Sequence, residues 1–116
     1  MFETINRTAL IITPKQPVID WQNKIFPDSP ITNHLEDKND NGNVFLIPQF
    51  DDPDGYMDYI KRNFKEIFHY QLWEWCIDKK LFPKVLTWKM FNEWFDWSIQ
   101  TMILDLVDED IEKEEF

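Results

Sequence analysis

The segment 37–42 carries oxygen-bearing side chains at alternate positions, which is the spacing that a hard cation needs. Asp37, Asn39 and Asn41 precede Gly42, as in the first half of a calcium loop, where glycine permits the sharp turn. The twelfth position of such a loop is Pro48, where the pattern needs a bidentate glutamate. We therefore keep these three residues only as weak metal candidates, expect no metal and no cofactor, and interpret the segment as a solvated turn.

A second group of carboxylates lies ahead of a periodic apolar segment and consists of Asp51, Asp52, Asp54 and Asp58. Acids near a helix N-terminus are stabilised by the helix dipole, by about 0.3–1 kcal/mol each, and need no ligand for this. Binding of a divalent metal or of a basic partner segment is the functional alternative to this structural interpretation.

Histidine and cysteine suggest two further kinds of site, a di-iron centre and a cysteine nucleophile, but the sequence lacks some of the residues that each would need. Glu66-x-x-His69 has the spacing of half a bundle-type di-iron site, which needs a second such motif and two more glutamates. Cys76 needs a histidine within hydrogen-bond reach to act as a nucleophile. His69 precedes it on the same predicted helix by about 10 Å of axial rise. We therefore interpret Cys76 as a buried thiol. It is the only cysteine, so no intramolecular disulfide can form, as expected for a cytoplasmic protein.

The charge distribution argues against nucleic-acid binding. Lys79, Lys80 and Lys84 surround Phe82, and bases interleaved with aromatic rings can bind nucleic acid, but the net charge is −10 without a basic stripe. Residues 105–116 hold seven acids and one base, whereas residues 1–104 hold 15 acids and 11 bases. We interpret residues 108–116 as an acidic flexible tail and expect no nucleic-acid partner.

Aromatic side chains are concentrated between Phe64 and Trp97, where 11 of 34 residues are aromatic and five are tryptophan. This density indicates either a heavy aromatic core or a surface that binds a partner. One small core has limited room, so we expect some rings to be partly exposed. The candidate interface or pocket residues are Trp73, Trp88, Trp94, Trp97 and His69.

Hydrophobic periodicity predicts the elements that position these side chains. Strands are expected at 7–13 and 44–47, and helices at 17–26, at 56–76 with a break near His69, and at 88–97 with Thr87 as N-cap. Residues 100–107 either extend the last helix or form a third strand. We favour the strand, because a two-stranded sheet is marginal.

The predicted fold is a two-layer α/β domain, with α+β as the variant, in which helices pack on a small mixed three-stranded sheet. The order is β-α-β-α-α-β, and the first β-α-β would be a parallel pair with a right-handed crossover. Residues 1–107 form a single globular domain in this prediction. No apolar run approaches 18 residues, so no membrane span is expected.

Four short segments together resemble a family of small bacterial proteins of uncharacterised function. They are residues 7–10 (RTAL), 45–51 (FLIPQFD), 82–84 (FPK) and 91–96 (FNEWFD). The resemblance covers most of residues 5–107 and implies a compact α/β domain. It implies no activity and no functional residues.

The expected function is a non-catalytic interaction module, a homodimer or a binder of another protein, acting through an aromatic surface within residues 73–97. The alternative is a small-ligand or enzymatic cleft lined by Trp73, Trp88 and Trp94 with Asp51, Asp52 or His69. An acidic mimic of nucleic acid is a third idea, which the near balance of charge in residues 1–104 opposes.

Overall fold

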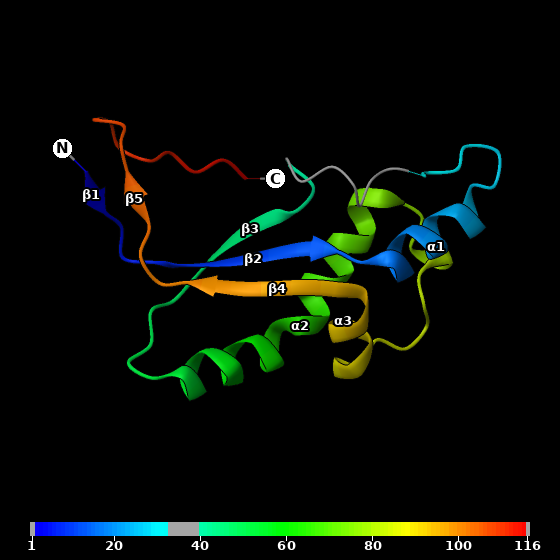
Figure 1. The fold of residues 1–116 in the computed structure, drawn as a ribbon, viewed down its shortest axis with the longest axis horizontal. Coiled ribbons are helices and arrows are strands. Elements are labelled where there is room, and N and C mark those ends of the chain that lie inside the picture. Colours follow the sequence, from blue (N-terminus) through cyan, green and yellow to red (C-terminus); the bar gives the residue numbers. More distant parts are fainter. Residues whose placement is uncertain (1, 33–39, 116) are drawn as a thin grey trace.

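The computed structural model describes residues 2–32 and 40–115 (Figure 1). The strands are β1 (Glu3–Thr4), β2 (Thr8–Pro14), β3 (Asn43–Ile47), β4 (Phe95–Gln100) and β5 (Leu104–Asp105). The helices are α1 (Gln16–Ile25), α2 (Pro53–Trp75), the short 3-10 helix η2 (Lys79–Leu81) and α3 (Trp88–Trp94). One sheet has the order β3-β2-β4, and β1 pairs with β5 in a separate ribbon.

The three-stranded sheet is antiparallel throughout, because both β3 and β4 run antiparallel to β2. The predicted parallel pairing of the first two strands, and with it the mixed sheet, is therefore wrong. A parallel connection would require the intervening helix to carry the chain back across the sheet. Instead, α1 lies beyond the end of β2 (Figure 1), and β3 begins beside that same end, where Asn43 pairs with Ile12. The α+β variant of the prediction, with helices packed against one face of the sheet, is confirmed.

Capping residues define where the helices begin. The Asp52 side chain accepts a hydrogen bond of 2.9 Å from the Gly55 N–H, and Pro53 follows in the first turn of α2. Asp52 therefore has the structural role expected of an acid at a helix start. Thr87 caps α3 as predicted, since its hydroxyl accepts from the Met90 N–H at 3.1 Å. The expected break near His69 is absent, and α2 continues to Trp75.

The third strand begins earlier than expected. α3 ends at Trp94, and β4 takes over at Phe95, which pairs with Pro14 at the end of β2. Along β4, Phe95, Trp97 and Ile99 pack towards the core, while the intervening residues are exposed. This period of two is masked in the sequence, because the aromatic residues of α3 and β4 follow one another without a polar gap.

The core lies between the sheet and α2 with α3. Leu10 and Ile12 of β2, Phe68 of α2 and Phe91 of α3 have no exposed surface, and Phe95 of β4 is 1% exposed. The ring of Phe68 lies 5.2 Å from Phe95 and 6.1 Å from Phe91, centroid to centroid. Many of the aromatic side chains from Phe64 to Trp97 therefore pack between the sheet and the helices.

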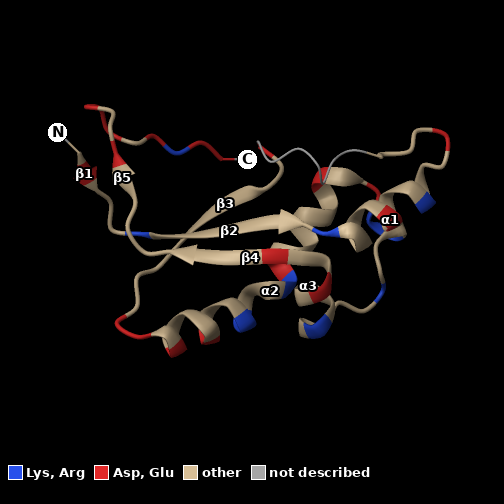
Figure 2. Cartoon of the chain, viewed as in Figure 1, with Lys and Arg blue, Asp and Glu red and all other residues tan. Residues whose placement is uncertain are grey.

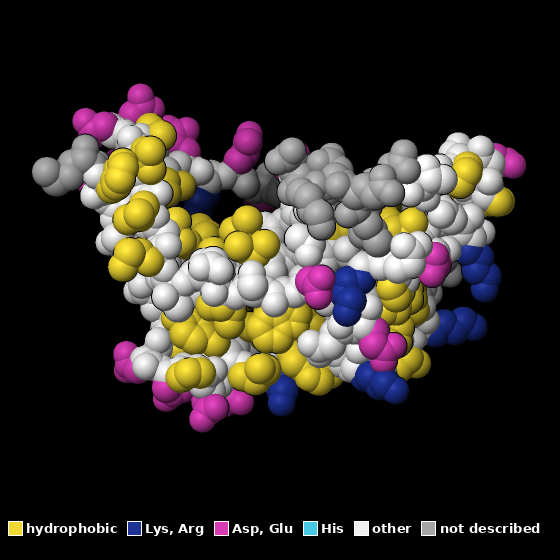
Figure 3. Space-filling model, viewed as in Figure 1, with side chains coloured by type: hydrophobic (Ala, Val, Ile, Leu, Met, Phe, Trp, Pro, Cys, Tyr) yellow, Lys and Arg dark blue, Asp and Glu magenta, His cyan; other side chains and the backbone are white. Residues whose placement is uncertain are grey.

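The β1–β5 ribbon extends away from this core. Its pairs are Glu3 with Asp105 and Thr4 with Leu104, and the following chain leads into the acidic C-terminus, which is exposed over residues 108–115. The radius of gyration is 16.1 Å, against about 13 Å for a compact domain of this length. Figure 3 shows hydrophobic side chains gathered on this ribbon, at the upper left.

Candidate functional site

Three of the five candidate residues take part in core packing. The Trp88 ring stacks on Phe91 at 5.7 Å, and Trp94 lies 5.5 Å from Phe68. The Trp97 indole N–H donates a hydrogen bond of 3.0 Å to the Asn92 side chain. All three tryptophans are half-buried. Packing against neighbouring rings accounts for much of their burial. The predicted aromatic surface within residues 73–97 stays a prediction.

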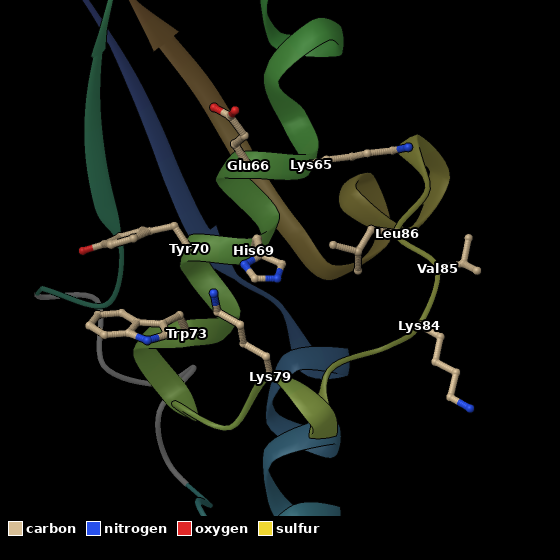
Figure 4. A pocket seen from close by; sticks show the side chains of 9 residues that line it. All are labelled: Lys65, Glu66, His69, Tyr70, Trp73, Lys79, Lys84, Val85 and Leu86. Atoms are coloured by element: carbon tan, nitrogen blue, oxygen red, sulfur yellow. The ribbon is translucent and has the colours of Figure 1, made fainter.

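The other two candidates, His69 and Trp73, line one open cleft, which we call the His69 cleft (Figure 4). It has a volume of about 720 Å³ and lies between the C-terminal half of α2, η2 and the chain that leads to α3. Trp73 is 37% exposed. The expectation that some tryptophan remains exposed is thus confirmed at Trp73.

The aromatic side chains of the His69 cleft are held by neighbouring rings. The His69 ring meets Phe82 edge to face at 5.0 Å, and Tyr70 stacks with Trp73 at 6.2 Å. A hydrogen bond from the Tyr70 phenol to the Glu74 carboxylate raises the pKa of Tyr70, and burial and the negative charge of Glu74 act in the same direction. These contacts fix the position of the cleft's aromatic wall.

A second cleft, of about 790 Å³, is lined by Asp51, Asp52, Tyr56 and Trp97 among others. The Tyr56 hydroxyl is held by Thr8 at 2.8 Å and by the Phe50 N–H at 3.1 Å. The residues predicted to line one small-ligand or enzymatic cleft therefore lie in different parts of the structure. Asp51 and Asp52 lie with Trp97, whereas His69 lies with Trp73 in the other cleft. Trp88 and Trp94 line neither of them.

The metal and nucleophile candidates are only partly covered by the described residues. Asp37 and Asn39 lie outside the described residues, and Asn41 is half-buried. Among residues 2–32 and 40–115, no three His, Cys, Asp or Glu side chains are grouped so that they could hold a metal ion. Cys76 is 6% exposed, and its thiol lies 3.8 Å from the Asp78 carbonyl oxygen. The prediction of a buried thiol is confirmed.

Strand β3 presents a surface that the sequence did not reveal. Val44 and Leu46 are 61% and 47% exposed. They pair with Ile11 and Ala9 of β2 on the sheet face opposite the helices, which we call the open face. In the described part of the chain, β3 is also an edge strand, since only β2 pairs with it. The one signal for this surface in the sequence is the absence of any charged residue from Asn43 to Ile47.

The face of β3 that points towards α2 is also apolar and adjoins the same edge. Phe45 lies 5.9 Å from the Tyr70 ring, and together with Ile47 and Tyr59 these residues line a groove of about 310 Å³ between β3 and α2. β3 thus has apolar side chains on both faces beside an outer edge with backbone hydrogen-bonding groups. An extended partner segment could pair with such an edge.

Comparisons with protein-family models, with curated proteins and with solved structures found no match. The resemblance to small bacterial proteins therefore stays a prediction. In the described part of the chain, no helix combines the length and the apolar character that a membrane span requires.

Proposed function

We propose that the protein is a non-catalytic interaction module that forms a homodimer by pairing the β3 edges of two copies. The observation that carries this proposal is the character of β3, an edge strand of five residues without a charged side chain. Proteins usually protect such edges with lysine, proline, bulges or covering chain, because an unprotected edge recruits another strand. Figure 2 illustrates the contrast with β4, where Asp96 lies within the other edge strand.

The β3 sequence fits antiparallel pairing with a second copy of itself. With the two-fold axis at Phe45, Val44 of each copy lies opposite Leu46 of the other on the open face. Directly opposed apolar side chains in antiparallel strands stabilise a sheet by roughly 0.2–1 kcal/mol per pair. Pairing would cover two side chains that are now 61% and 47% exposed, and it would join two three-stranded sheets into one.

The surface beside β3 provides further contact area. A stable interface buries about 800 Å² on each partner, which is more than a short strand edge supplies by itself. The groove with Phe45, Tyr59 and Tyr70 lies directly beneath the edge, so the α2 helices of two paired copies would approach each other there. Tyrosine and phenylalanine are enriched in such interfaces. The aromatic contribution to the dimer then comes from β3 and α2.

A reducing, cytoplasmic setting is part of the proposal. The single cysteine is a free, buried thiol, and no disulfide contributes to the fold. Disulfide-free small domains are typical of such compartments.

Sedimentation velocity tests the dimer. We expect the wild-type protein to sediment as a dimer and the Val44→Lys and Leu46→Lys variants as monomers, because lysine opposite an apolar residue in the pair would lose its hydration. Ile77→Lys is the matched control, since Ile77 is 77% exposed and lies in the connector after α2. It should leave the dimer intact.

Far-ultraviolet circular dichroism would establish that the lysine variants remain folded. A wild-type protein that is monomeric up to millimolar concentration would refute the proposal. Equal dissociation by Ile77→Lys would also count against it, because the effect would then come from charge alone.

A further inference from the structure

The His69 cleft gathers positive charge in an acidic protein. Three lysines line it together with His69, against the carboxylate of Glu66 in the lining and that of Glu74 on Tyr70, while the whole chain has a net charge of −10. A concave surface lined by one sign of charge focuses the potential and raises the local concentration of ions of the opposite sign. The cleft therefore favours an anion, although the protein as a whole repels one.

The arrangement of the side chains narrows the kind of anion. In Figure 4 the Lys79 side chain points towards the side of the cleft that holds His69 and Trp73, while the Lys84 side chain points away from the cleft. Tyr70 and Trp73 are stacked on one side, and Leu86 lies on the other. A lysine ammonium group together with an imidazole, between an aromatic and an aliphatic wall, suits a ligand with a negatively charged group and a flat apolar part.

We propose that the His69 cleft binds a small anion that carries a planar ring. Its negatively charged group contacts Lys79 and His69, and its ring lies against Trp73. The volume of about 720 Å³ is in the range of small-molecule sites. The charged group is a phosphate or a carboxylate, both of which accept hydrogen bonds from lysine and histidine. The cleft adjoins the groove beside β3, because Glu66 and Tyr70 line both, but Lys79, His69 and Trp73 do not line that groove. Binding at these three residues does not depend on dimer formation.

Isothermal titration calorimetry with four probes tests the site. Adenosine monophosphate and indole-3-acetate each combine a ring with an anion, whereas adenosine and inorganic phosphate each supply one part. We expect at least one of the combined probes to bind about tenfold more tightly than either single part, since both walls and the cations then contribute. The two combined probes present a phosphate and a carboxylate, the two charged groups that the proposal allows.

Two neighbouring lysines provide a matched pair of variants. Lys79→Gln should weaken binding of the combined probe about tenfold, the effect of removing one charge-assisted hydrogen bond. Lys80→Gln makes the same change of charge at the next residue of η2, which does not line the cleft, and should leave affinity within about twofold. Trp73→Leu should weaken binding of the ring-bearing probes and leave that of inorganic phosphate unchanged.

Three results would overturn the proposal. These are the absence of binding of both combined probes at millimolar concentration, equal losses in Lys79→Gln and Lys80→Gln, and unchanged affinity in Trp73→Leu. The titration repeated with Leu46→Lys separates this proposal from the dimer, because the affinity of the cleft should be the same in that variant.

Discussion

The aromatic stretch from Phe64 to Trp97 and the strand β3 are both strongly apolar, yet they differ in what covers them. Phe68 and Phe91, in the aromatic stretch, have no exposed surface. Val44 and Leu46, in β3, are among the exposed hydrophobic residues of the domain. Helices α2 and α3 pack against the sheet and against each other, whereas β3 is covered on one face and paired along one edge.

This difference shows that exposure follows from the number of neighbours of an element more than from its apolar content. Ten of the eleven aromatic residues are buried or half-buried, because the sheet, the opposite helix and α1 all contact this stretch. Trp21 of α1, for example, lies 6.3 Å from Trp94. Trp73 stacks on Tyr70 at the rim of the His69 cleft and remains 37% exposed. The surface available for partners therefore lies at the margins of the aromatic region.

Truncation of a central ring should have the largest effect. Phe68→Ala removes a side chain that contacts the rings of Phe91, Trp94 and Phe95. We expect the free energy of unfolding, measured by urea denaturation, to fall by about 3–5 kcal/mol. Ile77→Ala, at an exposed apolar position, should change it by no more than about 0.5 kcal/mol. Similar losses in both variants would remove the distinction between packed and marginal apolar residues.

A smaller loss is expected where β3 begins. A Cβ at Gly42 would collide with the Ile12 carbonyl oxygen and lie 2.7 Å from the Thr13 side chain. Gly42→Ala should therefore lower the unfolding free energy by about 1–3 kcal/mol, the usual cost of overpacking. Because the displaced residue adjoins β3, the variant should also dimerise more weakly in sedimentation. A stable Gly42→Ala variant with unchanged dimerisation would show that β3 does not depend on this close approach.

The smallest effect concerns Tyr70, which joins the two regions through its contacts with Phe45 and Trp73. Its pKa is raised in the folded state by the hydrogen bond to Glu74, so the folded protein retains this proton at pH values where the unfolded chain has lost it. This contribution to stability is complete below about pH 10, the ordinary tyrosine pKa, and is lost as the pH rises through the folded value.

Ultraviolet difference spectra of the wild type and of Tyr70→Phe would isolate this titration. Glu74→Gln should bring the pKa of Tyr70 back towards its ordinary value, because it removes the negative charge of the hydrogen-bond acceptor. An unshifted phenol in the wild type would contradict the assignment of Glu74 as its partner.

Local signals predicted much of the secondary structure. Asp52 and Thr87 satisfy backbone N–H groups within their own helical turns, so both helix starts were predictable from neighbouring residues. The antiparallel course of β3 was not predictable in this way. It depends on α1 packing beside α3 and η2, where Trp21 meets Phe82 at 5.9 Å, instead of across the sheet. That contact joins residues far apart in the chain.

The candidate site was also predictable only where its residues are close together in the sequence. His69 and Trp73 lie one helical turn apart on α2, so the sequence already placed them on one face. Of the three lysines of the His69 cleft, Lys65 belongs to α2, but Lys79 and Lys84 come from η2 and from the chain after it. Asp51 and Asp52 lie elsewhere, beside Trp97. The composition of each cleft is set by which segments meet across the fold.

The sequence by itself determined where α2 and α3 begin, the residues that cap them and the apolar character of the strands, because these depend on residues a few positions apart. The tertiary structure alone decided which apolar side chains lie in the core and which remain at the surface. Val44 and Leu46 are exposed because β3 lies at the edge of its sheet with one face uncovered, while the aromatic rings of α2 and α3 are largely buried between layers. Burial depends on contacts between distant segments, and those contacts exist only once the layers have assembled.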